Sequence, residues 1–329
     1  MRGWAAGPES DSGARAAARA ERLGGLVRRS VLIVPANVHR FVEKAHRRGA
    51  DAVMLDLEDS VPPGEKEAAR RALGEAIASV GRGGADVLVR INKPFDLAIE
   101  DLDAAVVPGL AAIGFPKAES EPEIAILDAL IRERELRRGL TPGGIGLAVT
   151  VETARGLARV DAILSASDRI ETVDVGAEDL TRDLEIEPSA SGEELLLARQ
   201  SVVQAARRAG VQPLGLSTTL ANYGDLDALR DSVARAHATG FRGAGCIHPD
   251  QVPVLNELFQ PSGPSVERAR RVLTLYEEAL AAGRASAALD GRMIDVPVAE
   301  RASRLIARAD TIARKEAHKR EALARLVDG

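Results

Sequence analysis

The chain has 329 residues, of which 45% are hydrophobic and 28% are charged, and its formal net charge is −5. This size suits one large globular domain with an appendage, or two domains, and the mildly acidic balance gives no electrostatic reason to expect nucleic acid or an anionic membrane as a partner. No apolar run approaches the roughly 18 residues of a membrane-spanning helix. The single cysteine, Cys246, excludes an internal disulfide, and together these features favour a cytoplasmic protein.

The N-terminal segment, residues 1–27, is rich in Ala, Arg, Gly and Ser and has no apolar core. It therefore does not match a secretory signal. Its arginines and serines resemble those of a transit peptide, but Glu9, Asp11 and Glu21 argue against one. We expect a flexible tail that contains a short helix.

Eight short apolar runs rich in β-branched residues alternate with helical patterns over residues 28–260. The runs comprise residues 31–35, 52–57, 87–91, 112–116, 146–151, 172–175, 213–216 and 244–247. Apolar residues recur at helical spacing in 40–48, 65–80, 123–138, 154–165, 193–209 and 226–239. Near-continuous apolar strands that alternate with helices indicate a parallel sheet, and eight such units predict an α/β fold of the TIM (β/α)8 barrel type. A doubly wound sheet is the alternative, but no glycine-rich phosphate motif follows the first strand.

The barrel pattern ends at the sequence Pro261-Ser262-Gly263-Pro264. A predicted helix over 265–282, a small loop-like unit over 289–297 and a long charged helix from 298 to about 326 follow it. This extension is amphipathic but too polar to form a core of its own. We therefore expect residues 261–329 to form a helical lid that packs on the barrel or on another subunit.

Charged or polar residues follow the end of most predicted strands. In chain order they are Glu58 and Asp59, Arg90 and Asn92, Lys117 and Glu119, Glu152, Asp179, residues 217–219, and His248. Because strand ends converge on one mouth of a parallel barrel, Glu152 and Asp179 should lie close together. Two hard oxygen ligands there make an incomplete cage of the kind that Mg²⁺ completes with water and substrate. We predict both as metal ligands; the alternatives are helix N-caps or ion-pair partners of nearby cations.

The other strand-end residues divide into substrate contacts and structural groups. Arg90 is suited to grip a carboxylate through two parallel hydrogen bonds, with a structural ion pair as the alternative. Glu58 and Asp59 are expected to orient metal-bound water and substrate, and Glu178 is placed with them as a substrate-binding residue. A Schiff-base role for Lys117 is less favoured.

Two residues of the last predicted strand region receive structural interpretations. We expect His248 to be a hydrogen-bonded core histidine rather than a base. Cys246 lies within the strand itself and is expected to be an inert buried thiol.

Seven motifs occur in a fixed order along the chain and carry a family resemblance. They are Arg29-Ser30-Val31-Leu32-Ile33-Val34-Pro35, Leu55-Asp56-Leu57-Glu58-Asp59-Ser60-Val61, Val89-Arg90-Ile91-Asn92, Phe115-Pro116-Lys117-Ala118-Glu119, Val151-Glu152-Thr153-Ala154-Arg155-Gly156, Gly176-Ala177-Glu178-Asp179-Leu180 and Cys246-Ile247-His248-Pro249-Asp250-Gln251. With them the chain resembles the citrate lyase beta-subunit-like (CitE-like) family of the HpcH/HpaI aldolase superfamily, from about residue 28 to 307. Within it, the chain is similar to malyl-CoA and citramalyl-CoA lyases.

The resemblance implies a Mg²⁺-dependent barrel, with Mn²⁺ as a substitute, that makes or breaks a carbon–carbon bond between an acyl-thioester enolate and a 2-keto acid. Glu152 and Asp179 fall on the family's metal ligands, and Arg90 falls on its substrate-carboxylate arginine. Arg292-Met293-Ile294-Asp295 resembles a C-terminal segment whose aspartate, here Asp295, reaches a neighbouring subunit's site as acid/base. Such relatives are commonly trimers or hexamers.

The expected activity is cleavage or formation of malyl-CoA or citramalyl-CoA, giving acetyl-CoA and glyoxylate or pyruvate, with CoA as part of the substrate. Three alternatives stay open: the beta subunit of a citrate lyase complex acting on a carrier-bound citryl thioester, a metal-dependent aldolase of free hydroxy-keto acids, and a non-catalytic metabolite sensor.

Overall fold

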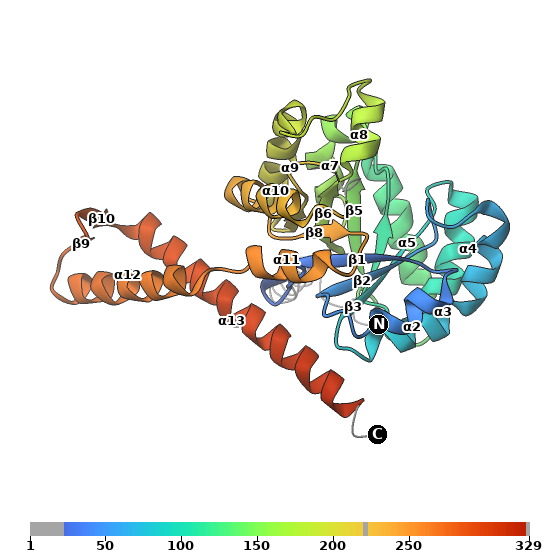
Figure 1. The fold of residues 1–329 in the computed structure, drawn as a ribbon, viewed down its shortest axis with the longest axis horizontal. Helices are drawn as coiled ribbons and strands as arrows, with labels where there is room; N and C mark the ends of the chain where they lie inside the picture. Colours follow the sequence, from blue (N-terminus) through green and yellow to red (C-terminus); the bar gives the residue numbers. More distant parts are fainter. Residues whose placement is uncertain (1–22, 220–222, 327–329) are drawn as a thin grey trace, which may run out of the picture.

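Eight parallel strands form a barrel in the computed structural model, which describes residues 23–219 and 223–326 (Figure 1). The strands are β1 (Ser30–Pro35), β2 (Ala52–Asp56), β3 (Asp86–Arg90), β4 (Ala112–Phe115), β5 (Gly146–Val151), β6 (Ile170–Val175), β7 (Gln212–Leu214) and β8 (Ala244–Cys246). Neighbours pair in order from β1 to β7, and β8 pairs with β1. Gly215 N–H donates to the Gly243 carbonyl at 2.9 Å, and Arg242 N–H donates to the Pro213 carbonyl at 3.0 Å. These bonds bring β7 and β8 together, so the predicted TIM barrel is confirmed.

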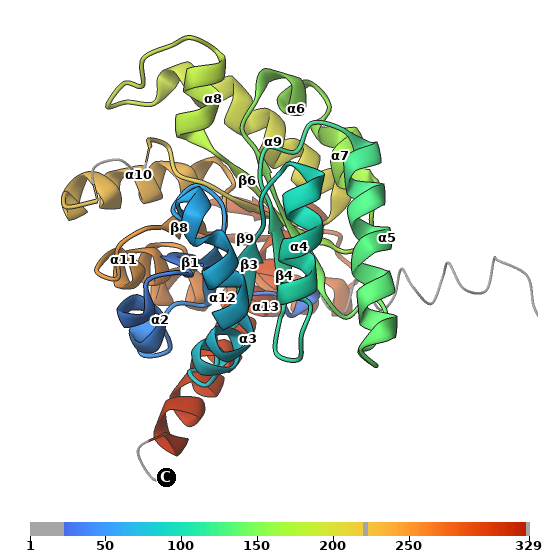
Figure 2. The ribbon, with the colours of Figure 1, turned by 90° about the vertical axis from the view of Figure 1, so that its right-hand side faces the viewer.

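Helices surround the barrel on its outer face (Figure 2). They are α2 (His39–Ala45), α3 (Lys66–Gly81), α4 (Phe95–Ala105), α5 (Glu121–Arg137), α6 (Ala154–Ala158), α7 (Val160–Ser165), α8 (Ala177–Asp183), α9 (Leu196–Ala209), α10 (Leu226–Thr239) and α11 (Gln251–Leu258). The sequence analysis did not predict α4, α8 or α11. The helix predicted over 154–165 is interrupted at Arg159, which ends α6 and precedes α7.

Apolar side chains fill the interior of the barrel below its mouth. The buried cluster there consists of Val31, Ala52, Leu88, Ala112, Ala148 and Leu214, with Met54 packed against it. Side chains alternate between the two faces of a strand. Counting in steps of two from Ala52, Leu88 and Ala148 therefore places Asp56, Arg90 and Glu152 on the same interior face, nearer the mouth. Because side chains alternate along each strand, these polar residues point into the barrel at the C-terminal ends of the strands.

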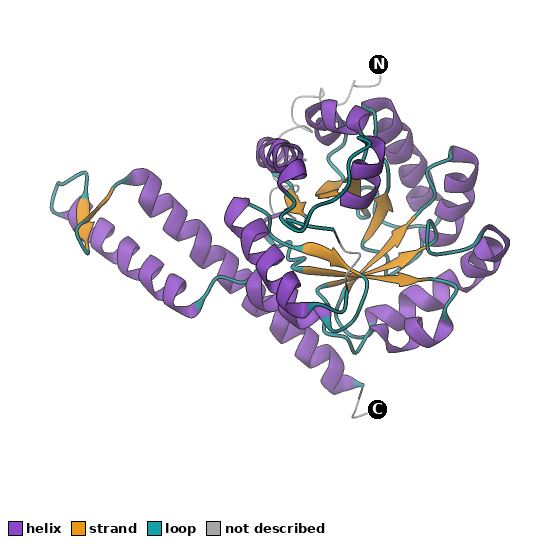
Figure 3. Ribbon diagram, turned by 45° about the horizontal axis from the view of Figure 1, so that its top comes forward, coloured by secondary structure: helices purple, strands orange, loops and turns teal. Residues whose placement is uncertain are grey.

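The C-terminal extension forms an arm that projects away from the barrel (Figures 1 and 3). It contains α12 (Gly263–Ala281), the antiparallel hairpin of β9 (Ala287–Leu289) and β10 (Arg292–Ile294), and the first part of α13 (Val296–Arg325). The loop predicted over 289–297 is therefore wrong in part. Asp290 and Gly291 have positive φ of 51° and 74°, as the two central residues of a type I′ hairpin turn require.

The arm also has a small core, contrary to the expectation from its polarity. Ala269 and Val272 of α12 are buried against Leu289 and Ile294 of the hairpin and Ala302 of α13. The arm is therefore a packed unit rather than a loose tail. Its outer surface nevertheless exposes apolar groups, including Met293, whose relative exposure is 66%.

The second half of α13 packs on the N-terminal face of the barrel through buried ion pairs. Lys319 Nζ lies 2.8 Å from Asp51 Oδ1, and Arg29 Nε lies 2.8 Å from Asp51 Oδ2. Arg28 Nη2 in turn lies 2.7 Å from Glu171 Oε2 inside the barrel. Breaking one partner of such a buried pair is costly because it leaves an uncompensated charge. The base of the arm is thus firmly seated on its own barrel.

No helix in the described ranges is long and apolar enough to cross a membrane. Most of the predicted N-terminal tail, residues 1–22, lies outside the described residues. The cytoplasmic location stays a prediction.

Candidate active site

Glu152 follows β5 directly and is held from two sides at the mouth of the barrel. Its side chain is buried, and Oε1 accepts a 2.7 Å hydrogen bond from the backbone N–H of Lys117. On the other side lies Gly176, where an added Cβ would come 2.2 Å from Glu152 Oε2. The glycine therefore leaves the space that the carboxylate occupies. Thr153, the next residue, caps α6 by accepting a hydrogen bond from Gly156 N–H at 3.1 Å.

Asp179 lies in the first turn of α8, directly after β6. Its Oδ1 pairs with Arg182 Nη2 at 2.6 Å, and its Oδ2 lies 3.9 Å from Lys117 Nζ. Burial and the negative charge of Asp179 raise the pKa of Glu152 to about 7. Asp179 is thus close enough to destabilise the ionised form of Glu152, and a cation between the two carboxylates would relieve this repulsion.

Lys117 faces this acidic group with both its backbone and its ammonium. Its φ of 49° is unusual for a non-glycine residue. The Nζ atom hydrogen-bonds Glu58 and lies 3.4 Å from Asp59 Oδ2. Burial opposes the charged form, but the hydrogen bond to Glu58 and the surrounding carboxylates raise the pKa of Lys117 above its ordinary value. A lysine held in its ammonium form is a poor nucleophile, so the Schiff-base interpretation is not favoured.

Arg90 is committed to a neighbouring carboxylate that the sequence analysis did not single out. Its Nε and Nη2 each donate a 2.7 Å hydrogen bond to the two oxygens of Asp56, which is fully buried. Its remaining terminal nitrogen, Nη1, lies 3.2 Å from Glu58 Oε2. Although burial opposes it, the bond to Asp56 raises the pKa of Arg90 above its already high value. The fork that could bind a substrate carboxylate is therefore used within the protein, and Nη1, beside Glu58, is the terminal nitrogen not bound to Asp56.

The acidic residues at the second and sixth strand ends differ in exposure. Glu58 is buried, whereas Asp59 and Glu178 reach the solvent. Burial, partly offset by Arg90 and Lys117, raises the pKa of Glu58. Its Oε2 is buried and accepts no hydrogen bond from any described residue. Its one close cationic neighbour is Arg90 Nη1 at 3.2 Å, so a water or ligand could still donate a hydrogen bond to it.

Two further lysines support the loops that carry these groups. Lys66 Nζ donates to the carbonyls of Leu57 and Glu58 at 2.7 and 2.8 Å, which fixes the chain after β2. Lys93 Nζ donates to the carbonyl of Lys117 and so supports its left-handed backbone. Lys66 begins α3 and Lys93 follows β3, and neither was singled out from the sequence.

The remaining candidates lie away from the acidic group or have structural surroundings. His248 has a side chain that is 42% exposed and stacks on Tyr223 with ring centroids 5.6 Å apart, so the prediction of a core histidine is wrong. Cys246 is fully buried, and burial raises the pKa of its thiol, as expected for an inert group. Asp295 lies at the end of the arm, where its Oδ1 accepts a 3.3 Å hydrogen bond from Val298 N–H and caps α13. Asp295 directly follows β10, and the arm that carries this strand projects away from the barrel of its own chain (Figure 3).

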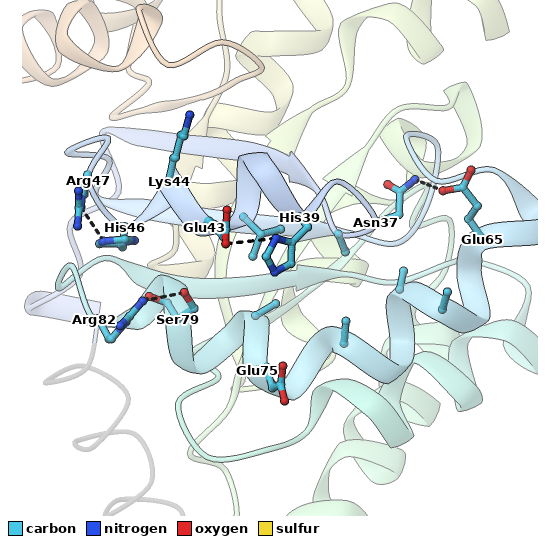
Figure 4. A pocket seen from close by; sticks show the side chains of 16 residues that line it. Asn37, His39, Glu43, Lys44, His46, Arg47, Glu65, Glu75, Ser79 and Arg82 are labelled. Atoms are coloured by element: carbon cyan, nitrogen blue, oxygen red, sulfur yellow. Dashed lines mark hydrogen bonds and ion pairs between the residues drawn. The ribbon is translucent and has the colours of Figure 1, made fainter.

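A pocket of about 580 Å³ lies outside the barrel, between α2 and α3 (Figure 4). Polar groups such as His39, Glu43 and Arg82 surround it, while alanines of α3 form part of its wall. It contains none of the predicted site residues and is separate from the strand-end group.

The family model of HpcH/HpaI aldolase/citrate lyase matches residues 29–249. The chain belongs to this family. Among its relatives, the citrate lyase subunit beta from Escherichia coli is 34% identical over 284 residues, covering 86% of this chain and 93% of the relative. The L-malyl-CoA/beta-methylmalyl-CoA lyase from Cereibacter sphaeroides is 30% identical over 305 residues, covering 86% and 95%. The resemblance read from the motifs is confirmed, and the family places the chain among carbon–carbon lyases.

A solved structure of the protein CitE from Mycobacterium tuberculosis, in complex with magnesium, acetoacetate and coenzyme A, is 28% identical. Its TM-score is 0.67, and the match covers 87% of this chain and 99% of that chain.

The side chains at the mouth of this HpcH/HpaI aldolase/citrate lyase fit a hard divalent cation. The described residues contain no group of three or more His, Cys, Asp and Glu that could hold a metal alone. Two carboxylates with water and substrate oxygens are, however, the donor set that Mg²⁺ accepts. The raised pKa of Glu152 beside Asp179 shows that Lys117 and Arg182 do not fully compensate the burial and repulsion of this carboxylate, which a divalent cation would do.

Proposed function

We propose that the chain is a Mg²⁺-dependent lyase of 3-hydroxyacyl-CoA thioesters such as malyl-CoA or citramalyl-CoA, which it converts to acetyl-CoA and glyoxylate or pyruvate, or forms in reverse. The observation that carries this proposal is the buried carboxylate of Glu152 beside Asp179, because burial and then the negative charge of Asp179 raise the pKa of Glu152 to about 7. Support comes from the relative named a malyl-CoA lyase and from the structural neighbour that holds magnesium and coenzyme A.

Glu152 and Asp179 would hold the metal ion through their carboxylate oxygens. When bound, Mg²⁺ supplies a Lewis acid and a template for the oxygens of the keto acid. Mn²⁺ should substitute because carboxylate and water ligands suit both ions. The hydrogen bond from Lys117 N–H to Glu152 Oε1 leaves Oε2 as the oxygen free for coordination.

Arg90 and the second-strand acids would orient the charged end of the substrate. With Nε and Nη2 bound to Asp56, Arg90 has Nη1 to offer a substrate carboxylate. Glu58, beside this nitrogen, and Asp59 and Glu178, at the solvent edge, would hold water and substrate hydroxyls. The rigid Asp56 fork fixes the guanidinium before substrate arrives, which reduces the ordering cost of binding.

Cleavage breaks the carbon–carbon bond between the hydroxyl-bearing carbon and the carbon next to the thioester. The hydroxyl loses its proton as it becomes the keto group, and the enolate carbon gains a proton to become the methyl group of acetyl-CoA. We assign the second proton transfer to Asp295 of a neighbouring copy. The length of the arm supports this, because its 19-residue helix α12 spans about 28 Å at 1.5 Å per residue.

Shared sites of this kind require a closed oligomer, which we propose to be a trimer or a hexamer. A head-to-tail contact in a ring gives every barrel one arm from its neighbour. The seated base of α13 would anchor the arm to its own barrel, and its exposed tip would reach the next mouth. An arm that closes over the substrate would also exclude water from the enolate.

A thioester panel with product detection, run with and without Mg²⁺, tests this function. Malyl-CoA and citramalyl-CoA should release acetyl-CoA only with the metal. Cleavage restricted to a citryl thioester on a carrier protein would identify a citrate lyase beta subunit, a reading favoured by the 34% identical relative. Cleavage of free hydroxy-keto acids would identify an aldolase. Binding of a keto acid without turnover of any compound would identify a sensor.

A further inference from the structure

Three arginines gather on the N-terminal face of the barrel, at the end opposite to the candidate active site. They come from α9, from the α10–β8 connection and from α13, and they bind three consecutive backbone carbonyls. Arg207 Nη2 donates to the Gly240 carbonyl at 3.1 Å, Arg242 Nη1 to the Phe241 carbonyl at 2.8 Å, and Arg308 Nη2 to the Arg242 carbonyl at 3.3 Å. We call Arg207, Arg242 and Arg308 the arginine cluster. Consecutive Cα atoms are about 3.8 Å apart, so the three guanidinium groups lie along a short segment of backbone.

The arginine cluster has no acidic partner in the described part of the chain. Within residues 23–219 and 223–326, none of its members forms an ion pair within 4 Å, whereas Arg28 and Arg29 on the same face are both paired with carboxylates. Arg207 reaches the solvent, and Arg242 and Arg308 are half-buried. The Nε atom of Arg308 is buried and makes no hydrogen bond to a described residue.

The arginines of the cluster and their cationic neighbours repel one another, and Asp51 offsets this repulsion only in part. Burial and Arg207 lower the pKa of Arg242, and burial and Arg304 lower the pKa of Arg207. Arg308 has its pKa lowered to about 10 by burial and the other arginines, against the attraction of Asp51. That aspartate is already bound to Arg29 and Lys319. Among the described residues, no carboxylate pairs with the positive charge of the arginine cluster at this junction.

Guanidinium groups favour anions that offer several acceptor oxygens, because their fork donates two parallel hydrogen bonds. A partly buried cation without a counter-ion is costly, and a bound anion removes that cost. We propose that Arg207, Arg242 and Arg308 form a binding site for a phosphate-class anion at the junction between α13 and the barrel. By linking three elements, the bound anion would stabilise the seating of the arm. The source is either free inorganic phosphate or the diphosphate of a nucleotide.

Thermal unfolding of the full chain with phosphate, pyrophosphate or chloride at matched ionic strength tests the site. For a Kd of about 1 mM, 10 mM phosphate should raise Tm by about 2 °C beyond the effect of chloride. Preference for phosphate would identify the free ion as the ligand, and preference for pyrophosphate would identify a nucleotide diphosphate. Equal effects of all three anions on the wild type would overturn the proposal, since only screening would then be at work.

Variants locate the site. Arg207→Gln and Arg242→Gln should each lose the anion-specific shift while folding normally, and Arg207→Gln should not be less stable than the wild type without the anion. Arg208→Gln is the matched control, because Arg208 is the next residue on the same helix and pairs with Asp161 at 2.7 Å. It should keep the full shift. A shift that persists in both cluster variants would place the anion elsewhere and refute the proposal.

Discussion

The backbone N–H of Lys117 and the absent side chain of Gly176 together fix the carboxylate of Glu152. The N–H donates to Oε1 at 2.7 Å, and Oε2 lies where a Cβ on Gly176 would be only 2.2 Å away. One residue thus aims the carboxylate and the other makes room for it. Because α8 begins directly after Gly176, the same turn also positions Asp179.

Gly176→Ala should displace Glu152 without disturbing the fold. The φ of Gly176 is −74°, which any residue adopts, so the effect comes from the clash with the carboxylate alone. We expect Mn²⁺ affinity, measured by electron paramagnetic resonance, to fall about 10-fold or more, in the range found when groups that orient a metal ligand are removed. Gly64→Ala, at a glycine with open space around it, is the control. Unchanged Mn²⁺ affinity in Gly176→Ala would contradict the assignment of Glu152.

The raised pKa of Glu152 predicts how stability depends on pH in the metal-free protein. Its ordinary pKa is 4.5 and its folded pKa is about 7, so between these values the folded state keeps a proton that the unfolded state has lost. Stability should therefore fall as pH rises through this window, by up to about 1.4 kcal/mol per pH unit, and level off above it. Urea unfolding in EDTA from pH 5 to 8 should show this slope in the wild type. The Glu152→Gln variant should lack this slope. If the stability of the variant and of the wild type changed with pH in parallel, the raised pKa of Glu152 would be refuted.

Arg90→Lys should lose both the Asp56 fork and the donor proposed for substrate. We expect the free energy of unfolding to fall by about 1.5–3 kcal/mol, the value of a hydrogen bond to a charged group. A loss of the same size in transition-state binding would reduce kcat/KM about 10- to 100-fold. Urea unfolding and steady-state kinetics measure the two effects. Lower stability with unchanged kcat/KM would assign Arg90 to structure alone.

Asp295→Asn should keep the fold, because asparagine also caps helices well, yet lose activity by about 10²-fold or more if the residue transfers a proton. Mixed rings of Asp295→Asn and Glu152→Gln subunits should regain activity. In an equal mixture about a quarter of the composite sites would be intact, since each needs one particular barrel and one particular arm. Reassembled hybrids that remain inactive, with both variants folded, would refute the shared site.

The strands and the convergence of their ends could be predicted because strand period and barrel geometry are encoded locally. Asp56 was missed because it is one of several acids in its motif, and nothing local shows that Arg90 will reach it across the β2–β3 pair. The β9–β10 hairpin was missed although Asp290-Gly291 is a turn signal, since strands of three residues give too little alternation to detect. The short helix α8 likewise has too few turns for a helical period. Contacts between distant segments, such as the ion pair of Lys319 with Asp51, cannot be predicted from the local sequence around either residue.

The most direct test of the proposed function is acetyl-CoA release from malyl-CoA and citramalyl-CoA by metal-stripped enzyme, measured as Mg²⁺ is restored. The account predicts no release after EDTA treatment, saturable recovery with Mg²⁺, loss of that recovery in Glu152→Gln, and no borohydride trapping at Lys117. Full activity in EDTA, with substrate trapped on Lys117 by borohydride, would contradict it.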